Sequence, residues 1–213
     1  MKFSHTAGRV SASWLIVITA FAAALGLWFG TRMFATPPAP NLEATLLYPA
    51  PRALPDFQLV RSDGTPFTQA DWKGRWTVVF FGFTNCPDVC PNTLSTLRQT
   101  WATLGTQGLH DRVRIDFISV DPQRDTPAQL ARYTAFFSPD FVAATGSDEE
   151  LTRLTRALGL LYHREPAQDG HYSVDHSASL VVIDPQGRQA GLIKPPFDAA
   201  RIARDLGTLA GGG

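Results

Sequence analysis

The chain has 213 residues with 19 acidic and 19 basic side chains, so its formal net charge at neutral pH is zero. Because Lys and Arg are not clustered, the sequence provides no electrostatic surface for nucleic acid or for anionic lipid. Hydrophobic residues make up 44% of the chain, which predicts one well-packed domain with additional segments. Two cysteines are too few for a disulfide framework.

The N-terminal residues predict a membrane anchor. After a cytoplasmic segment at 1–11, residues 12–31 carry no charge and are long enough to cross a bilayer as one helix. Trp14 and Trp28 lie near its two ends, where aromatic rings prefer the membrane interface. A cleaved signal peptide is the alternative, but no clear A-x-A site follows the apolar run. The excess of basic residues before the span places the N-terminus in the cytoplasm and the rest of the chain outside it.

Residues 32–53 predict a proline-rich linker without packed structure. The folded domain is expected at 54–210, and the glycines at 211–213 are expected to form a flexible tail.

Strands and helices alternate through the predicted domain. Strands are expected at 56–60, 76–83, 113–120 and 141–145, and helices from Pro91 onward, at 126–137 and at 147–158. The last third predicts a β-hairpin instead, with strands 178–183 and 189–193 around the turn 184–187, followed by a helix at 198–209. An α/β core of parallel strands that finishes in a hairpin and a helix is typical of the thioredoxin-like fold.

Cys86 and Cys90 lie directly after the apolar strand 76–83. Because a helix is expected to start near Pro91, both thiols lie near a helix N-terminus, where unpaired N–H groups favour the thiolate and lower its pKa. The pair is consistent with a structural disulfide, a redox couple or half of a metal site. A structural disulfide is the weakest of these, because so short a loop leaves little chain entropy to remove.

His176 is the best candidate for a third ligand. In a thioredoxin-like sheet, its position at the mouth of the hairpin's first strand lies beside the cysteine loop. Two thiolates and one imidazole form a soft, three-coordinate set that suits Cu(I), whereas zinc normally takes a fourth ligand. The other histidines favour other roles: His5 precedes the anchor, His110 is expected in a solvated turn, and His163 and His171 flank a polar stretch.

Asp121, Arg124 and Asp125 form a second polar motif after the strand 113–120. In one interpretation Asp121 caps the strand end, and Arg124 forms a local ion pair with Asp125. In the other, this loop borders the cysteines, where it tunes the site or presents charge to a partner. The sequence alone leaves both interpretations open.

Three ordered motifs together resemble the Sco/SenC family of copper proteins: Gly82 to Pro91 (GFTNCPDVCP), Ser119 to Pro127 (SVDPQRDTP), and Val174 to Ser177 (VDHS) with Asp184 to Gly187 (DPQG). The resemblance covers the chain from about Leu54 onward. It implies that Cys86, Cys90 and His176 bind copper, with Cu(I) as the expected state and Cu(II) left open. It further implies a metallochaperone that helps to build the binuclear copper centre of cytochrome c oxidase.

The resemblance also implies partners and a location. The partners are the copper-bearing subunit of cytochrome c oxidase, other copper chaperones and thioredoxin-like reductants. The protein would be a single-pass inner-membrane protein whose domain faces the periplasm, or the intermembrane space in mitochondria.

Two enzymatic functions remain open beside the metallochaperone. A thiol-disulfide reductase would use Cys86 and Cys90 as catalytic residues, one attacking and one resolving, on the copper-ligand cysteines of the oxidase subunit. A peroxidase of the same fold has less support, because no second motif that would assist a nucleophile is evident. A His176→Ala variant would distinguish the metallochaperone from the reductase. If the protein is mainly a reductase, this variant should lose copper but keep much of its thiol-exchange activity.

Overall fold

The structure, a computed structural model, describes residues 12–33, 40–160, 162–164, 174–176 and 179–211, with the backbone alone for 162–164 and 174–176. The chain divides into two units, Met1–Ala39 and Pro40–Gly213. The first contains α1 (Ala12–Met33), and its part Ser13–Met33 has a mean hydropathy of 1.9 and sufficient length to cross a bilayer. The apolar helix expected at 12–31 is therefore present.

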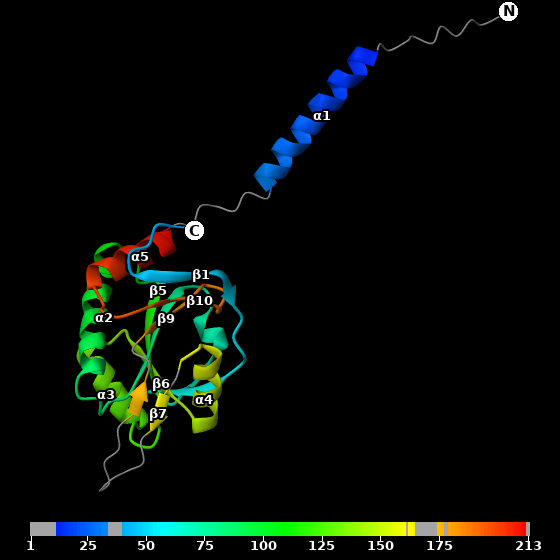
Figure 1. The fold of residues 1–213 in the computed structure, drawn as a ribbon. Coiled ribbons are helices and arrows are strands. Elements are labelled where there is room, and N and C mark those ends of the chain that lie inside the picture. The colour runs from blue at the N-terminus through cyan, green and yellow to red at the C-terminus, as the bar shows by residue number, and fades with distance from the viewer. Residues whose placement is uncertain (1–11, 34–39, 161, 165–173, 177–178, 212–213) are drawn as a thin grey trace, which may run out of the picture. The chain divides into compact units, whose positions relative to one another are not determined.

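The second unit is built on an eight-stranded mixed sheet (Figure 1), in the spatial order β1-β10-β9-β4-β5-β6-β2-β3. Strands β4, β5 and β6 are parallel, and β9 and β10 add the antiparallel hairpin that the sequence predicts beside β4. The strands are β1 (Thr45–Arg52), β2 (Gln58–Arg61), β3 (Pro66–Thr68), β4 (Trp76–Gly82), β5 (Val113–Ser119), β6 (Val142–Thr145), β9 (Leu180–Ile183) and β10 (Gln189–Ile193).

Helices cover both faces of this sheet. In Figure 1, α2 (Val89–Thr106), α3 (Pro127–Phe137) and α5 (Ala199–Gly211) lie on one side and α4 (Asp148–Ala157) lies on the other. Right-handed crossovers explain this arrangement. From β4 to β5 to β6 the chain moves across the sheet in one direction, which puts α2 and α3 on one face. From β6 to β9 the chain moves across the sheet in the opposite direction, which puts α4 on the other face. The short 3-10 helix η1 (Gln69–Trp72) precedes β4.

The central strand β4 is covered on both faces. Every residue from Thr77 to Gly82 is buried, which accounts for its continuous apolar sequence. Phe80 packs against Phe117 of the neighbouring strand, with 5.9 Å between the ring centroids. The end of β4 is therefore a rigid support for the loop that follows.

Strand β1 lies within the segment 32–53 that was predicted as a linker. It pairs antiparallel with β10, and the buried carboxylate of Asp205 on α5 accepts the N–H groups of residues 43–45 at 2.7–2.9 Å. The prolines of β1 are tolerated because an edge strand needs no donors on its outer side. The expectation that packing begins near Leu54 was therefore wrong, and the compact unit begins at Pro40.

A second, two-stranded sheet consists of β7 (Tyr162–Arg164) and β8 (Val174–His176), which pair antiparallel with Tyr162 opposite His176. His176 was expected at the mouth of the hairpin's first strand. It ends β8 instead, and the hairpin strand begins separately at Leu180. This ribbon was not predicted, because its polar sequence shows no regular apolar alternation.

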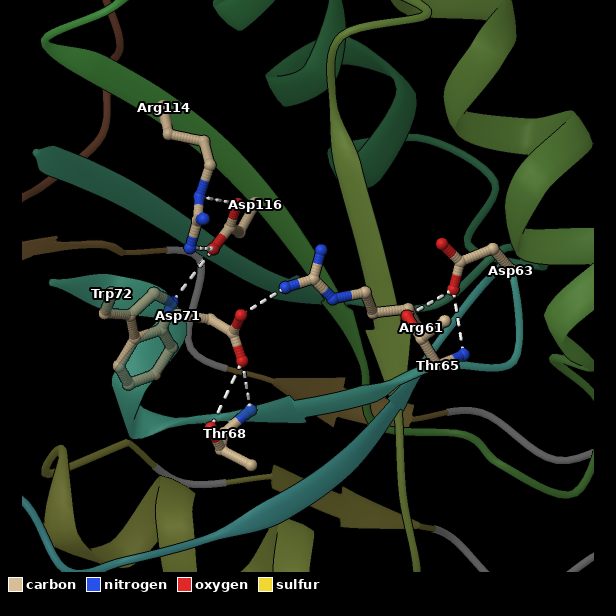
Figure 2. Close-up of polar contacts among 8 residues, drawn as sticks. All are labelled: Arg61, Asp63, Thr65, Thr68, Asp71, Trp72, Arg114 and Asp116. Carbon is tan, nitrogen blue, oxygen red and sulfur yellow. Dashed lines mark hydrogen bonds and ion pairs between the residues drawn. The ribbon is translucent and has the colours of Figure 1, made fainter. Parts of the chain in front are cut away.

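A polar cluster joins β5, η1 and β2 (Figure 2). Asp116 of β5 is 1% exposed, forms an ion pair with Arg114 at 2.9 Å and accepts the indole N–H of Trp72 at 2.8 Å. Burial raises the pKa of the Asp116 carboxyl, and the Arg114 guanidinium opposes that rise. The neighbouring Asp71 pairs with Arg61. These contacts fasten η1 and β2 to the central strands.

Candidate metal centre

The two cysteines lie where β4 leads into α2. The N–H of Cys86 donates to the carbonyl of Phe83 at 3.3 Å, which closes a turn directly after the strand. Helix α2 begins at Val89, so Cys90 lies in its first turn, slightly earlier than Pro91 indicated. Neither cysteine forms a disulfide, and the N–H of Cys90 donates to Cys86 Sγ at 3.3 Å. The two sulfur-bearing residues are thus held on one turn of the chain.

The two thiols differ in exposure. Cys86 is half-buried, whereas Cys90 is fully buried. Gly82 provides the space for Cys90, because a Cβ at position 82 would lie 2.8 Å from Cys90 Sγ and 2.9 Å from Phe117 Cε2. The missing side chain at Gly82 is therefore a requirement of the site. The sequence showed this glycine only as part of a motif.

The pKa of Cys90 is raised rather than lowered, which corrects the expectation from the helix N-terminus. Burial is the largest cause and outweighs a hydrogen bond from the backbone of Phe83. The neighbouring Cys86 and Asp125 raise the pKa further. Without a metal, Cys90 is consequently a neutral thiol at physiological pH, and a metal that binds it must displace a proton.

The second polar motif lies against the cysteine loop. The carboxylate of Asp125 is fully buried and accepts three hydrogen bonds: from the N–H of Thr84 at 2.9 Å, from the Thr84 hydroxyl at 2.6 Å and from the Ser119 hydroxyl at 2.5 Å. Arg124 forms its ion pair with Asp121, so the interpretation that paired it with Asp125 was wrong. Thr84 lies 41 positions from Asp125 in the sequence, and no local pattern indicates this contact.

Tyr133 of α3 is a further residue near the thiols that the sequence did not single out. Burial raises its pKa most, and Cys90, Cys86 and Asp125 add to the rise. Its ring packs against Phe117, with 5.7 Å between centroids. Within the described part of the chain, its buried hydroxyl has no hydrogen-bond partner.

His176 is the last residue of β8, and the strand that follows along the chain, β9, pairs with β4. Strand β9 runs antiparallel to β4, with Val79 opposite Val181, so Leu180 lies toward the end of β4 that leads into the cysteine loop. His176 precedes Leu180 by four positions. Its side chain lies outside the described residues. Among the residues described, no group of three or more His, Cys, Asp or Glu side chains is arranged to hold a metal ion. The role of His176 as a ligand stays a prediction.

His110 packs rather than binds. Its ring stacks on Trp101 with 3.8 Å between centroids, and its Nε2 lies 3.0 Å from the Trp101 carbonyl oxygen. It is half-buried, so the expectation of a solvated turn residue was wrong about its surroundings. His5, His171 and the side chain of His163 lie outside the described residues.

Comparison with known proteins now decides the family. A family model described as SCO1/SenC matches residues 48–211. The chain belongs to the SCO1/SenC family. A protein of Stutzerimonas stutzeri is 40% identical over 161 residues, which cover 76% of this chain and 78% of that protein. The mitochondrial SCO2 homolog of Bos taurus is 36% identical over 152 residues, 71% of this chain. The chain spans 56% of that protein, about half the length of its mitochondrial relatives.

Solved SCO1/SenC structures share the fold. ScoI of Bradyrhizobium japonicum with copper bound superposes with a TM-score of 0.67 at 33% identity, covering 74% of this chain and 99% of that one. Yeast Sco1 with copper bound gives a TM-score of 0.67 at 29% identity, covering 73% and 87%. These likenesses confirm the predicted α/β fold of the thioredoxin-like class.

Proposed function

We propose that this SCO1/SenC protein is a copper metallochaperone that carries one copper ion as cargo on Cys86, Cys90 and His176. The observation that supports it most is the pair of thiols on one turn, joined by the hydrogen bond from the Cys90 N–H to Cys86 Sγ. Relatives of the same fold have been solved with copper bound. Thiolates are soft ligands that favour Cu(I), so the donors described here fit this ion.

The difference in exposure suggests how the cargo moves. Cys86 is half-buried and reachable by the thiol of a partner, whereas Cys90 is enclosed by α2 and β4. Copper would leave by stepwise ligand exchange, in which an incoming thiolate replaces Cys86 before Cys90. Cys90 then regains a proton, which its raised pKa favours. Release to the partner is thereby helped by the same burial that shields the thiol.

The proposed recipient is the copper-bearing subunit of cytochrome c oxidase, at its binuclear copper centre. The support for this recipient is the resemblance of the three sequence motifs to the family. In the same proposal, α1 anchors the chain in the inner membrane with its N-terminus in the cytoplasm. The copper-binding domain then lies in the periplasm, or in the intermembrane space of a mitochondrion.

A thiol-disulfide reductase is the second candidate. The observation that favours it is again the asymmetry of the pair, because an accessible thiol can attack a disulfide and a buried neighbour can resolve the mixed disulfide. The substrate would be the oxidised copper-ligand cysteines of the oxidase subunit.

Titration of the reduced full-length protein in detergent with Cu(I), against a chromophoric chelator, tests the proposal. We expect one equivalent of tightly bound Cu(I), lost in Cys86→Ser, in Cys90→Ser and in His176→Ala. His110→Ala is the matched control, because its imidazole is occupied by Trp101, and it should keep the copper. Copper retained after both cysteines are replaced would rule out this site.

Thiol exchange measured on the same variants separates the two candidates. A reductase predicts that His176→Ala loses copper yet reduces a disulfide peptide at the wild-type rate. A metallochaperone predicts slow disulfide reduction in every variant and in the wild type.

A further inference from the structure

We propose that Asp125 is a positioning residue for Cys86. Its carboxylate fastens the cysteine loop to the end of β5 and so holds the two thiols at the separation that metal binding requires. The expected effect on copper binding rests on the proposed function. The positioning role itself is argued from contacts within the described chain.

The contacts form one continuous path. Ser119, the last residue of β5, donates to Asp125 at 2.5 Å, and Asp125 accepts both the N–H and the hydroxyl of Thr84. Thr84 lies inside the turn that the Cys86 N–H closes on the carbonyl of Phe83. Cys86 Sγ in turn accepts the N–H of Cys90. A rigid strand end is thus linked through one carboxylate to the more exposed of the two thiols.

The carboxylate of Asp125 is not used for the other purposes that its position suggests. Helix α3 is capped by Thr126, which has a complete capping box with Gln129. The adjacent Arg124 pairs with Asp121. Within the described part of the chain, the hydrogen bonds that the Asp125 carboxylate accepts come from Thr84 and Ser119. Burying a carboxylate is costly unless hydrogen bonds compensate it, and these contacts join the cysteine loop to the end of β5.

The decisive variant is Asp125→Asn, studied in the full-length protein. An amide keeps the size of the side chain but accepts hydrogen bonds on only one of its terminal atoms, so at least one of the Thr84 and Ser119 contacts must reverse its direction or be lost, and none of them keeps a charged acceptor. We expect its affinity for Cu(I) to fall about 10- to 100-fold, as for other residues that orient metal ligands.

A second measurement needs no metal. When the protein exchanges with oxidised glutathione, its two thiols form one disulfide and two molecules of reduced glutathione are released. Because a loosened loop lowers the effective concentration of Cys86 at Cys90, the equilibrium constant for the disulfide should fall about tenfold in Asp125→Asn, or about 30 mV. This readout stays informative even if the wild-type protein binds no copper, so failure of the proposed function and failure of this inference can be distinguished.

Asp205→Asn is the matched control. Asp205 is also buried and accepts three hydrogen bonds from the backbone of residues 43–45, but it holds the start of β1. It should lower the unfolding midpoint and leave both the Cu(I) affinity and the disulfide constant of the folded protein unchanged.

Thr84 provides the second line of evidence if Asp125→Asn does not fold. Thr84→Val removes only the hydroxyl donor and should lower both constants, less than Asp125→Asn does. Thr84→Ser keeps the donor and should restore both. The inference is overturned if folded Asp125→Asn, or Thr84→Val in its place, has wild-type constants, or if Asp205→Asn changes them equally.

Discussion

Two buried carboxylates, Asp116 and Asp125, lie in and just after β5 and differ in their partners. Asp116 belongs to the framework of the sheet, and Asp125 contacts the candidate site. Asp116, in the middle of the strand, is held by the guanidinium of Arg114 and the indole N–H of Trp72 (Figure 2). Asp125, just beyond its end, is held by the hydroxyls of Ser119 and Thr84 and by one backbone N–H. The first carboxylate is paired with a cation and the second with neutral donors.

This difference in hydrogen-bond partners indicates a different role for each carboxylate. An ion-paired carboxylate in the core fixes the framework, and its charge is balanced locally. Asp125, whose donors are neutral, lies close to the thiols and is one of the groups that raise the pKa of Cys90. Replacing Asp116 should therefore change stability alone, and replacing Asp125 should change the site.

Asp116→Ala should have the largest effect on stability. It leaves the Arg114 guanidinium and the Trp72 N–H without their buried partner, so the free energy of unfolding should fall by about 3–5 kcal/mol. Chemical denaturation measures this loss. The paired replacement Arg114→Met with Asp116→Leu should lose less, because neither charge stays buried. An equal loss in the single and the double variant would show that the ion pair does not account for the effect.

Gly82→Ala should have the next largest effect on stability. Its new Cβ would meet Cys90 Sγ and Phe117 Cε2 within 3 Å, so overpacking should cost about 1–3 kcal/mol and displace the thiol. Gly207→Ala is the control, since its new Cβ would lie 3.1 Å from the flexible end of Gln107 and at an ordinary 3.7 Å from Leu109. Denaturation of both variants checks the cost. Equal stability of the two would contradict the tight packing described at Gly82.

Thiol reactivity sharpens the contrast between Cys86 and Cys90. In the metal-free reduced protein, iodoacetamide should modify Cys86 at least about tenfold faster than Cys90. Cys90 is buried, and each unit by which its pKa is raised lowers its thiolate fraction about tenfold. Raising the pH should accelerate Cys90 over the range in which its thiolate accumulates. Mass spectrometry of Cys86→Ser and Cys90→Ser gives the two rates. Equal rates at neutral pH would mean that Cys90 is not enclosed as described.

Replacing Glu150 should have the smallest effect on stability. Its pKa is lowered, first by the hydrogen bond from the Gln58 N–H and then by Arg153. A lowered pKa in the folded state stabilises the protein above the unfolded pKa, and this gain is lost as the pH falls through the folded pKa. Glu150→Gln should therefore cost at most about 0.5 kcal/mol at pH 7 and nothing at pH 2. Denaturation at both pH values checks this, and a cost that persists at low pH would exclude an ionic origin.

The elements with regular local patterns could be predicted from the sequence, and the contacts between distant segments could not. Helix α3 has its cap, its proline and its apolar spacing within its own residues, and it starts where Thr126-Pro127 indicated. Strand β1 contains prolines, and only β10 and Asp205 make it a strand.

The candidate site shows the same division. Cys86 and Cys90 were evident from their spacing after an apolar strand. The raised pKa of Cys90 was not evident, because it depends first on the burial of this thiol in the folded chain and then on the nearby Cys86 and Asp125. Thr84, the partner of Asp125 in the cysteine loop, lies 41 positions away along the chain, so only the fold brings the two together.

X-ray absorption at the copper edge of the Cu(I)-loaded full-length protein tests the central claim most directly. The account predicts two sulfur ligands and one nitrogen ligand on copper, with the sulfur signal halved in Cys86→Ser or Cys90→Ser and the nitrogen signal lost in His176→Ala. A copper environment of nitrogen and oxygen alone, with no sulfur, would contradict it.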